Sequence, residues 1–172
     1  MSSPSQPSPQ PIEQVVQEHL DRLGVPYRII DIDPTYADTA SFCERYGYPP
    51  ERSVNCILVT SKTGAKQYAA CLVQATRRLD VNRVVRRLMG VRRASFALTE
   101  ETGTHTGMRA GGVTPFGLSP DIPVYVDAPV MALSEIVVGG GGRATKVALA
   151  PQALERLPNA TVVEGLSLTP ER

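Results

Sequence analysis

The sequence lacks the features that mark several common classes of protein. No run approaches the ~18 apolar residues that a membrane helix needs. The first residues, M-S-S-P-S-Q-P, contain neither the basic nor the apolar region of a secretory signal. The cysteines at 43, 56 and 71 show no C-x-x-C spacing, and the two histidines are His19 and His105. We therefore expect buried thiols, no metal site, no membrane contact and a cytoplasmic location.

Familiar catalytic motifs are missing as well. The sequence contains no G-x-S-x-G, no G-K-[ST] phosphate loop and no H-E-x-x-H, and the glycine run at 139–142 lacks the flanks of a dinucleotide-binding turn. His105 is a candidate catalytic acid or base near neutral pH, although a single histidine beside a loop is more often an ordinary polar residue. Cys56 lies in an apolar stretch, so we expect an inert thiol there.

Length and composition indicate one globular domain. The chain has 172 residues, of which 42% are hydrophobic and 20% charged. We expect a disordered Pro/Ser/Gln-rich tail at 1–11, a domain at 12–165 and a C-terminal tail at 166–172. Hydrophobic periodicity predicts an α+β fold with a mixed, mainly antiparallel sheet and flanking helices. The expected helices cover 12–23, 36–46 and 80–90, with short helical turns from 99 and over 151–156; the expected strands cover 27–32, 54–61, 67–75, 94–97, 123–127, 135–138, 144–149 and 161–163.

Basic residues are unevenly distributed along the chain. Of 18 basic residues 15 are arginines, and seven of these, here called the arginine stripe, fall between 77 and 93 against the single acid Asp80. One interpretation is a solvated helix face. The other is a phosphate-binding surface, because guanidinium groups match phosphate oxygens in geometry. The stripe comprises Arg77, Arg78, Arg83, Arg86, Arg87, Arg92 and Arg93.

Residues 106–129 form the most distinctive stretch. Glycines stand at 107, 111, 112 and 117, and prolines at 115, 120, 123 and 129. Glycine adopts positive φ without penalty and proline fixes φ, so 111–115 is predicted to be a loop of preset shape with accessible backbone groups. A plain turn between two elements is the other interpretation.

Four segments resemble one family in the same order. G-G-V-T-P-F-G followed by V-Y-V-D resembles the signature of the YbaK/prolyl-tRNA-synthetase-associated domain family. The segments A-D-T-A-S-F-C-E-R-Y-G, A-T-R-R-L-D-V-N-R-V-V-R-R-L-M-G and V-V-G-G-G-G-R-A-T-K-V-A-L-A-P-Q-A-L resemble further family patterns. Members hydrolyse mischarged aminoacyl-tRNA. The resemblance implies a barrel-like sheet, no cofactor, the 3′ end of aminoacyl-tRNA as substrate and an aminoacyl-tRNA synthetase as a further partner.

The resemblance also implies a set of site residues. The predicted substrate-binding residues are Gly111, Gly112, Val113, Thr114, Pro115, Phe116, Gly117, Asp127 and Gly139. The residues predicted to contact tRNA phosphates are Arg77, Arg78, Arg86 and Arg87. Because a side chain at 111 would fill the pocket, we expect Gly111→Val to damage ligand binding more than stability.

One position departs from the family pattern. Family members carry a lysine at the head of the first long strand, and Asn55 occupies that position here. An amide donates a hydrogen bond but carries no charge, and losing a charged stabiliser costs on the order of 2.7–4 kcal/mol of transition-state energy. The leading prediction is a trans-editing aminoacyl-tRNA deacylase that uses Asn55. The alternatives are a non-catalytic module that binds an aminoacyl group or tRNA 3′ end, and a hydrolase for another ester.

Overall fold

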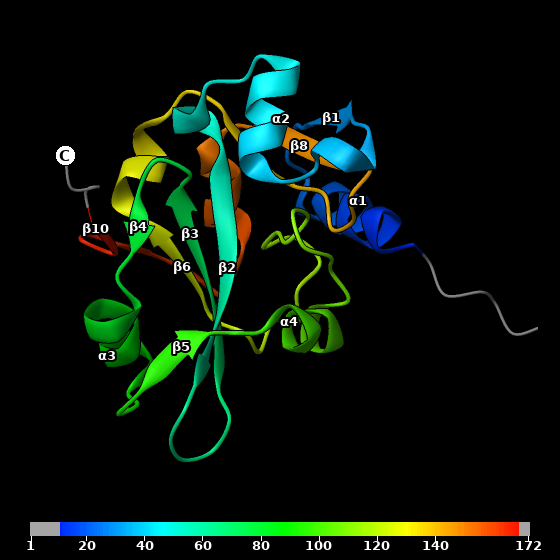
Figure 1. Cartoon of the computed structure of the whole chain (residues 1–172). Coiled ribbons are helices and arrows are strands. Elements are labelled where there is room, and N and C mark those ends of the chain that lie inside the picture. Colours follow the sequence, from blue (N-terminus) through cyan, green and yellow to red (C-terminus); the bar gives the residue numbers. More distant parts are fainter. Residues whose placement is uncertain (1–10, 169–172) are drawn as a thin grey trace, which may run out of the picture.

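The computed structural model describes residues 11–168, which form α-helices and strands arranged in layers (Figure 1). The predicted tails lie largely outside the described residues, at 1–10 and 169–172. The α-helices are α1 (Ile12–Leu23), α2 (Thr39–Tyr46), α3 (Arg86–Met89) and α4 (Thr99–Thr106). The strands are β1 (Arg28–Asp31), β2 (Val54–Ser61), β3 (Tyr68–Gln74), β4 (Arg78–Leu79), β5 (Ala94–Phe96), β6 (Val124–Asp127), β7 (Ile136–Gly139), β8 (Thr145–Leu149), β9 (Ala160–Val163) and β10 (Ser167–Leu168).

The strands pair into three sheets. The largest has the order β5-β2-β3-β6-β9 and is antiparallel from β5 to β3 and parallel from β3 to β9. A second, antiparallel sheet has the order β1-β8-β7, and β4 pairs with β10. The α+β class and the mixed, mainly antiparallel pairing are confirmed. The strands do not form one continuous sheet, because only the isolated bridge between Ser53 and Val137 joins β7 to the start of β2.

The first helix matches its predicted boundaries and the second begins later than predicted. Apolar residues at helical spacing place Val16 and Leu20 of α1 in the core, and Gly24 ends the helix with a φ of 70°. α2 begins later than predicted, at Thr39. The residues before it form a separate 3₁₀ turn (Pro34–Tyr36), in which the Asp33 carboxylate accepts a hydrogen bond from the Thr35 N–H.

Four segments differ from the prediction. The expected helix at 80–90 is a π-helical turn (Val81–Val85) followed by α3, although Asp80 caps it as predicted by accepting from the Arg83 N–H. α4 continues through Gly103 to Thr106. The strands β4 and β10 were not predicted. Because β10 pairs with β4 and Leu166 is fully buried, the folded chain continues beyond the predicted domain end at 165.

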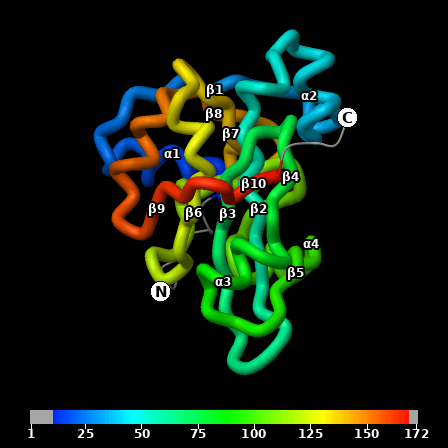
Figure 2. The backbone as a smooth tube through the Cα atoms, turned by 90° about the vertical axis from the view of Figure 1, so that its left-hand side faces the viewer, coloured from blue at the N-terminus to red at the C-terminus, as the bar shows by residue number. Residues whose placement is uncertain are grey.

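The main core lies between the two larger sheets and α1. It combines apolar side chains of β2, β3 and β6 with those of β7, β8 and α1. Smaller clusters lie beneath the π-helical turn and beneath α2. In Figure 2, β1, β8 and β7 occupy the upper part of the molecule, and the β2–β3 hairpin extends below them. The seam where β7 meets the start of β2 is therefore bordered by both sheets and covered by α2.

Candidate functional site

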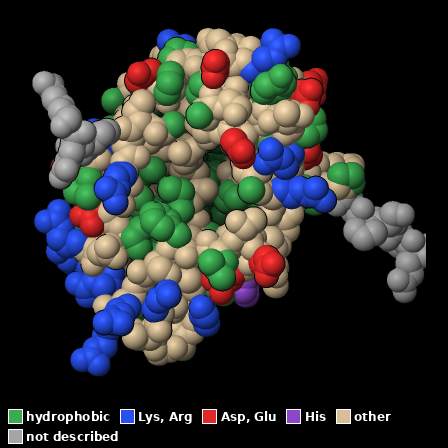
Figure 3. All heavy atoms as spheres, in the orientation of Figure 1, with side chains coloured by type: hydrophobic (Ala, Val, Ile, Leu, Met, Phe, Trp, Pro, Cys, Tyr) green, Lys and Arg blue, Asp and Glu red, His purple; other side chains and the backbone are tan. Residues whose placement is uncertain are grey.

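A cavity of about 210 Å³ opens at this seam. Its walls come from segments far apart in the sequence, and the face drawn in Figure 3 is hollowed near its centre. The start of α2, the start of β2, the glycine loop at 111–113, the end of β7 and one residue of β8 contribute. The lining residues are Asp38, Thr39, Phe42, Ser53, Val54, Asn55, Cys56, Ile57, Gly111, Val113, Val137, Val138, Gly139 and Lys146.

Asn55 lies on β2 at the edge of the cavity. Its side-chain oxygen accepts a hydrogen bond of 2.8 Å from the Thr39 hydroxyl of α2. This bond turns the Asn55 amide NH₂ group away from Thr39 and leaves it available as a donor. Thr39 and Asn55 also line a second cavity, of about 490 Å³, on the other side of α2. Asn55 therefore stands where two cavities meet.

Two glycine-rich segments build the opposite wall by packing backbone against backbone. Gly111 has a φ of 80°, and a Cβ there would lie 2.9 Å from the Ala37 carbonyl oxygen. The Gly141 N–H donates to the Gly112 carbonyl at 2.6 Å, and the Arg109 N–H donates to the Gly141 carbonyl at 2.9 Å. Side chains would prevent this approach, so the glycine run at 139–142 serves packing and holds the glycine loop in place.

Sequence reasoning missed Lys146, which enters the cavity from β8. Only 5% of Lys146 is exposed, and its ammonium donates to the Ala37 carbonyl at 2.6 Å and to the Gly111 carbonyl at 2.5 Å. It also lies 5.4 Å from the centre of the Phe42 ring. Burial lowers the pKa of Lys146 to about 8. The available signal was a lysine inside the otherwise apolar strand 144–149.

Arg143 reinforces the same wall just before β8. Its guanidinium donates to the Ala110 carbonyl at 2.8 Å, to the Pro34 carbonyl at 3.0 Å and to the Asp38 carboxylate at 3.2 Å. Arg143 thus joins the glycine loop to the segment before α2, the two segments that Lys146 also bridges. The planar guanidinium suits this role because it offers several donors in fixed directions.

The other residues predicted to bind substrate lie apart from this cavity. Phe116 is fully buried in the main core, and the Thr114 hydroxyl is buried without a hydrogen-bond partner among the described residues. Pro115 and Gly117 line a different cavity, next to His19, whose Nδ1 accepts from the Gly117 N–H at 2.5 Å. Of the predicted set, the cavity beside Asn55 brings together Gly111, Val113 and Gly139, with Gly112 packed behind them.

Asp127 is the remaining member of the predicted set and is buried elsewhere. Its carboxylate, only 1% exposed, accepts a hydrogen bond from the Ser167 hydroxyl. It also lies 3.7 Å from Nε of Arg77, which donates to Ser167 at 2.6 Å. These contacts connect Ser167 of β10 to Asp127 of β6 and to Arg77, which directly precedes β4. Arg77, the first arginine of the stripe, is therefore already bonded within the protein.

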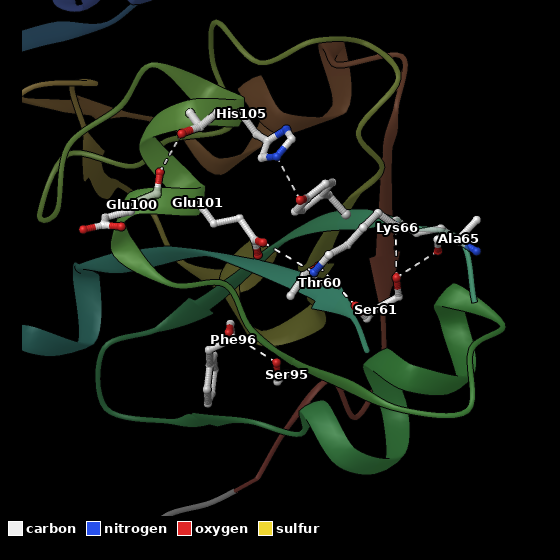
Figure 4. A network of polar contacts seen from close by, with 12 residues as sticks. Thr60, Ser61, Ala65, Lys66, Ser95, Phe96, Glu100, Glu101 and His105 are labelled. Carbon is white, nitrogen blue, oxygen red and sulfur yellow. Dashed lines mark hydrogen bonds and ion pairs between the residues drawn. The ribbon is translucent and has the colours of Figure 1, made fainter. Parts of the chain in front are cut away.

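His105 is not among the residues that line the cavity. It lies on α4, where its Nε2 is 2.8 Å from the Tyr68 hydroxyl of β3 and the two rings are 4.2 Å apart. Figure 4 shows this pair beside a contact between Lys66 and Glu101. The geometry therefore gives His105 a partner on β3, and its catalytic role stays a prediction. The Cys56 thiol does line the cavity, but burial raises its pKa, which favours the unreactive form.

The arginine stripe divides into engaged and exposed members. Besides Arg77, Arg83 pairs with Asp80 at 3.2 Å, and Arg86 donates to the Asn82 carbonyl at 3.0 Å. Arg78 and Arg87 are exposed. In Figure 3, basic side chains gather along the left and lower left edges, over α3, β5 and the β2–β3 hairpin.

Within residues 11–168, no three His, Cys, Asp or Glu side chains come together as a metal site. The same range contains no helix with the length and apolar content to cross a membrane.

Known proteins share both sequence and fold with this chain. A protein of Enterococcus faecalis named "Putative Cys-tRNA(Pro)/Cys-tRNA(Cys) deacylase EbsC" is 23% identical over 154 residues, which is 88% of this chain and 89% of that protein. The crystal structure of the hypothetical protein APE2540 matches with a TM-score of 0.79 and 24% identity, covering 90% of this chain and 99% of the other. A "putative trans-editing enzyme for prolyl tRNA synthetase" matches with a TM-score of 0.76 and 24% identity, covering 91% and 98%.

The family model for the aminoacyl-tRNA editing domain matches residues 33–157. This range is well over half of the chain and includes α2, β2, the glycine loop, β7 and β8, the five segments that enclose the cavity. The YbaK-like resemblance seen in the sequence is confirmed, as is the α+β fold of this family. The chain belongs to the aminoacyl-tRNA editing domain family, whose members are deacylases.

Proposed function

We propose that this protein is a trans-editing deacylase that hydrolyses the ester of mischarged aminoacyl-tRNA in the cavity beside Asn55. The observation that carries the proposal is this cavity, where the glycine loop faces Asn55 across about 210 Å³. Water attacks the ester carbonyl carbon, the bond to the ribose oxygen breaks, and the products are a free amino acid and a tRNA with a free 3′-hydroxyl. No metal or organic cofactor takes part in the proposed reaction.

Asn55 orients the substrate in this proposal. Its NH₂ group faces away from Thr39 and is a donor for the ester carbonyl oxygen. A neutral donor in a preorganised site stabilises charge that develops on that oxygen, and removing one such donor from an acyl-transfer site lowers kcat by about 10²–10³. The backbone of the glycine loop aligns the aminoacyl group on the other side.

The size of the cavity indicates the substrate class. Typical ligand pockets have volumes of about 300–1,000 Å³, whereas this cavity measures about 210 Å³. Its lining is partly apolar, with Val113, Val138 and the Phe42 ring. We therefore propose a small aminoacyl group as the substrate, because a large aromatic side chain would not fit between Asn55 and the glycine loop.

The second cavity suits the terminal nucleotide. It measures about 490 Å³, shares Thr39 and Asn55 with the first cavity, and is otherwise lined by residues such as Tyr48, Pro50 and Ala75. A base stacks well on such a surface. Placing the terminal adenosine here puts its ester beside Asn55, with the amino acid in the smaller cavity. The exposed Arg78 and Arg87 are then available for phosphates further along the tRNA.

The test is a deacylation panel of mischarged tRNAs, run with the native protein, Asn55→Ala and Asn55→Lys. We expect the native protein to hydrolyse at least one small aminoacyl ester, Asn55→Ala to be slower, and Asn55→Lys to be as fast or faster. The competing proposal, a non-catalytic binding module, is favoured by the missing charge at position 55. It is supported if no ester on the panel is hydrolysed at high protein concentration while an aminoacyl ligand still binds.

A further inference from the structure

Assuming the deacylase function proposed above, we propose that Lys146 supplies the positive charge of the reaction centre from β8, and that it donates its third N–H to the ester carbonyl oxygen. Asn55, which occupies the family lysine position on β2, is neutral and does not provide such a charge. Lys146 reaches the same cavity from a strand that lies roughly ninety residues further along the chain. The inference rests on its hydrogen bonds, its burial and the pairing of the Asp38 carboxylate.

The hydrogen bonds of Lys146 fix the direction of its ammonium group. An ammonium has three N–H donors, and two of them bind the carbonyls of Ala37 and Gly111 at 2.6 and 2.5 Å. Gly111 lines the wall formed by the glycine loop, and Ala37 directly precedes Asp38, which lines the wall on the side of α2. The Phe42 ring packs 5.4 Å from Nζ. The third donor therefore remains for a group that enters the cavity between these walls.

The charge of Lys146 is not neutralised by a carboxylate. Asp38, which lines the same cavity, is paired with Arg143 at 3.2 Å, and the described residues show no ion pair between Asp38 and Lys146 within 4.0 Å. Burying an unpaired charge is costly. A structural bridge alone does not explain this cost, because Arg143 already joins the glycine loop to the segment before α2 through Ala110 and Pro34. A ligand that develops negative charge would offset it.

The proposed step balances without a change in the protonation of Lys146. The water oxygen forms a bond to the carbonyl carbon, and the carbonyl electron pair moves onto the oxygen that faces the ammonium. The electrons return as the bond to the ribose oxygen breaks, and the proton lost by the attacking water goes to that ribose oxygen. Lys146 and the Asn55 amide stabilise the same oxygen from opposite strands, as preorganised donors do in acyl transfer.

The pH dependence of turnover tests whether the reaction needs the charged form of Lys146. The titratable and charged groups that face it are Asp38 and Cys43 on the side of α2, Arg143 before β8 and Cys56 on β2. Burial lowers the pKa of Lys146 to about 8, so the ammonium loses its proton above that pH. A neutral amine still has two N–H donors and keeps both carbonyl bonds, whereas the charge and the third donor are lost. Turnover should therefore fall above about pH 8 while the fold remains intact.

The experiment compares Lys146→Met, Lys146→Arg and the control Lys62→Met in single-turnover deacylation of the best mischarged tRNA, from pH 6.5 to 9.5. Lys62 is exposed on the hairpin between β2 and β3. We expect Lys146→Met to lower the rate about 100-fold and to abolish the decline above pH 8. Lys146→Arg should keep part of the rate without that decline, and Lys62→Met should stay within about twofold of the native rate. Circular dichroism and thermal melting establish that each variant is folded.

A second arm separates failure of this inference from failure of the proposed function. A non-hydrolysable 3′-aminoacylamino-adenosine, which carries an amide in place of the ester, is titrated into the native protein and the same variants. A native protein that is inactive on the whole panel overturns the deacylase function, and the Lys146 contact is then judged by this affinity. We expect Lys146→Met to weaken binding at least tenfold. The inference is overturned if folded Lys146→Met keeps native turnover, or, with an inactive native protein, if it binds the analogue as tightly as the native protein does.

Discussion

Two groups of cations in this protein differ in how they are built. Lys146 of β8 and Arg143 just before it stand three residues apart, and together they bind four backbone carbonyls of the glycine-loop region and the segment before α2. The arginine stripe has seven members, several of which bind groups of their own segment, such as Asp80 and the Asn82 carbonyl. The pair Lys146 and Arg143 therefore bonds to segments beside the cavity. Apart from Arg77, the arginine stripe instead bonds within its own segment or is exposed to solvent.

The difference shows that clustering in sequence is a weak guide to a buried site. A lysine inside an apolar strand attracts little notice, yet β8 lies between β1 and β7, so its side chains at alternate positions face α2 and the glycine loop. The stripe is dense because it follows one short segment of chain. Substitutions in the two groups should therefore have effects of different kind and size.

The largest effect is expected at Gly111, whose carbonyl accepts from Lys146. A valine there must adopt a φ of 80°, and its Cβ would lie 2.9 Å from the Ala37 carbonyl oxygen. Backbone strain and overpacking together cost about 4 kcal/mol. Chemical denaturation should show this loss of stability together with a loss of deacylation. This revises the expectation from sequence, which assigned the damage to ligand binding. A fully stable variant that lacks only binding would restore that expectation.

Within the stripe, Arg77 and Arg78 should differ sharply. Arg77→Ala removes a charge beside the buried Asp127 carboxylate and a donor to Ser167, which should cost about 3 kcal/mol. Arg78→Ala is the matched control, because the Arg78 side chain is exposed and its loss should change stability by less than about 0.5 kcal/mol. Urea denaturation of both variants measures the difference. Equal stabilities would mean that Arg77 behaves as an ordinary surface residue.

The sequence predicted those elements whose pattern is complete within one segment. α1 was predicted correctly because its apolar residues repeat at helical spacing and Gly24 ends it. β2 and β3 were predicted from continuous apolar runs. The two-residue strands β4 and β10 were missed, since a pair of residues has no period. The π-helical turn was predicted as part of an α-helix because both conformations bury the same valines.

The site could be predicted only in part, for a related reason. The resemblance to the family indicated Asn55 and Gly111 because each lies in a motif of its own. Lys146 could not be assigned, because its role depends on β8 lying beside β7 and beneath α2. The sequence of the 54–61 strand does not show which other strand lies near it in the fold.

The pH dependence of stability should identify the buried charge of Lys146. Its pKa is about 8 in the folded protein and 10.5 in the reference state, so between these values the unfolded chain binds more protons. The free energy of unfolding should therefore rise with pH from about 8 to 10.5 in the native protein relative to Lys146→Met, by roughly 3 kcal/mol. Taking the difference between the two proteins removes the opposite contribution of Cys71, whose pKa burial raises to about 12.

Urea denaturation of both proteins at half-unit pH intervals measures this difference. If the difference in unfolding free energy stays flat or falls above pH 8, burial does not destabilise the charged form of Lys146. That result would remove one support for its role in the cavity.

The smallest effect is expected at the exposed end of the stripe. If the stripe meets tRNA phosphates, Arg87→Ala should reduce the slope of log K against log salt by about 1, since one phosphate contact releases about one counterion. Arg86→Ala is the comparison, because the Arg86 side chain already donates to the carbonyls of Asn82 and Val91. Its loss should change the slope less. Neither variant should alter single-turnover deacylation at saturating tRNA, because both side chains lie outside the cavity.

Filter binding from 50 to 300 mM salt measures the slopes. Identical slopes for the native protein and both variants would leave the stripe as a solvated surface.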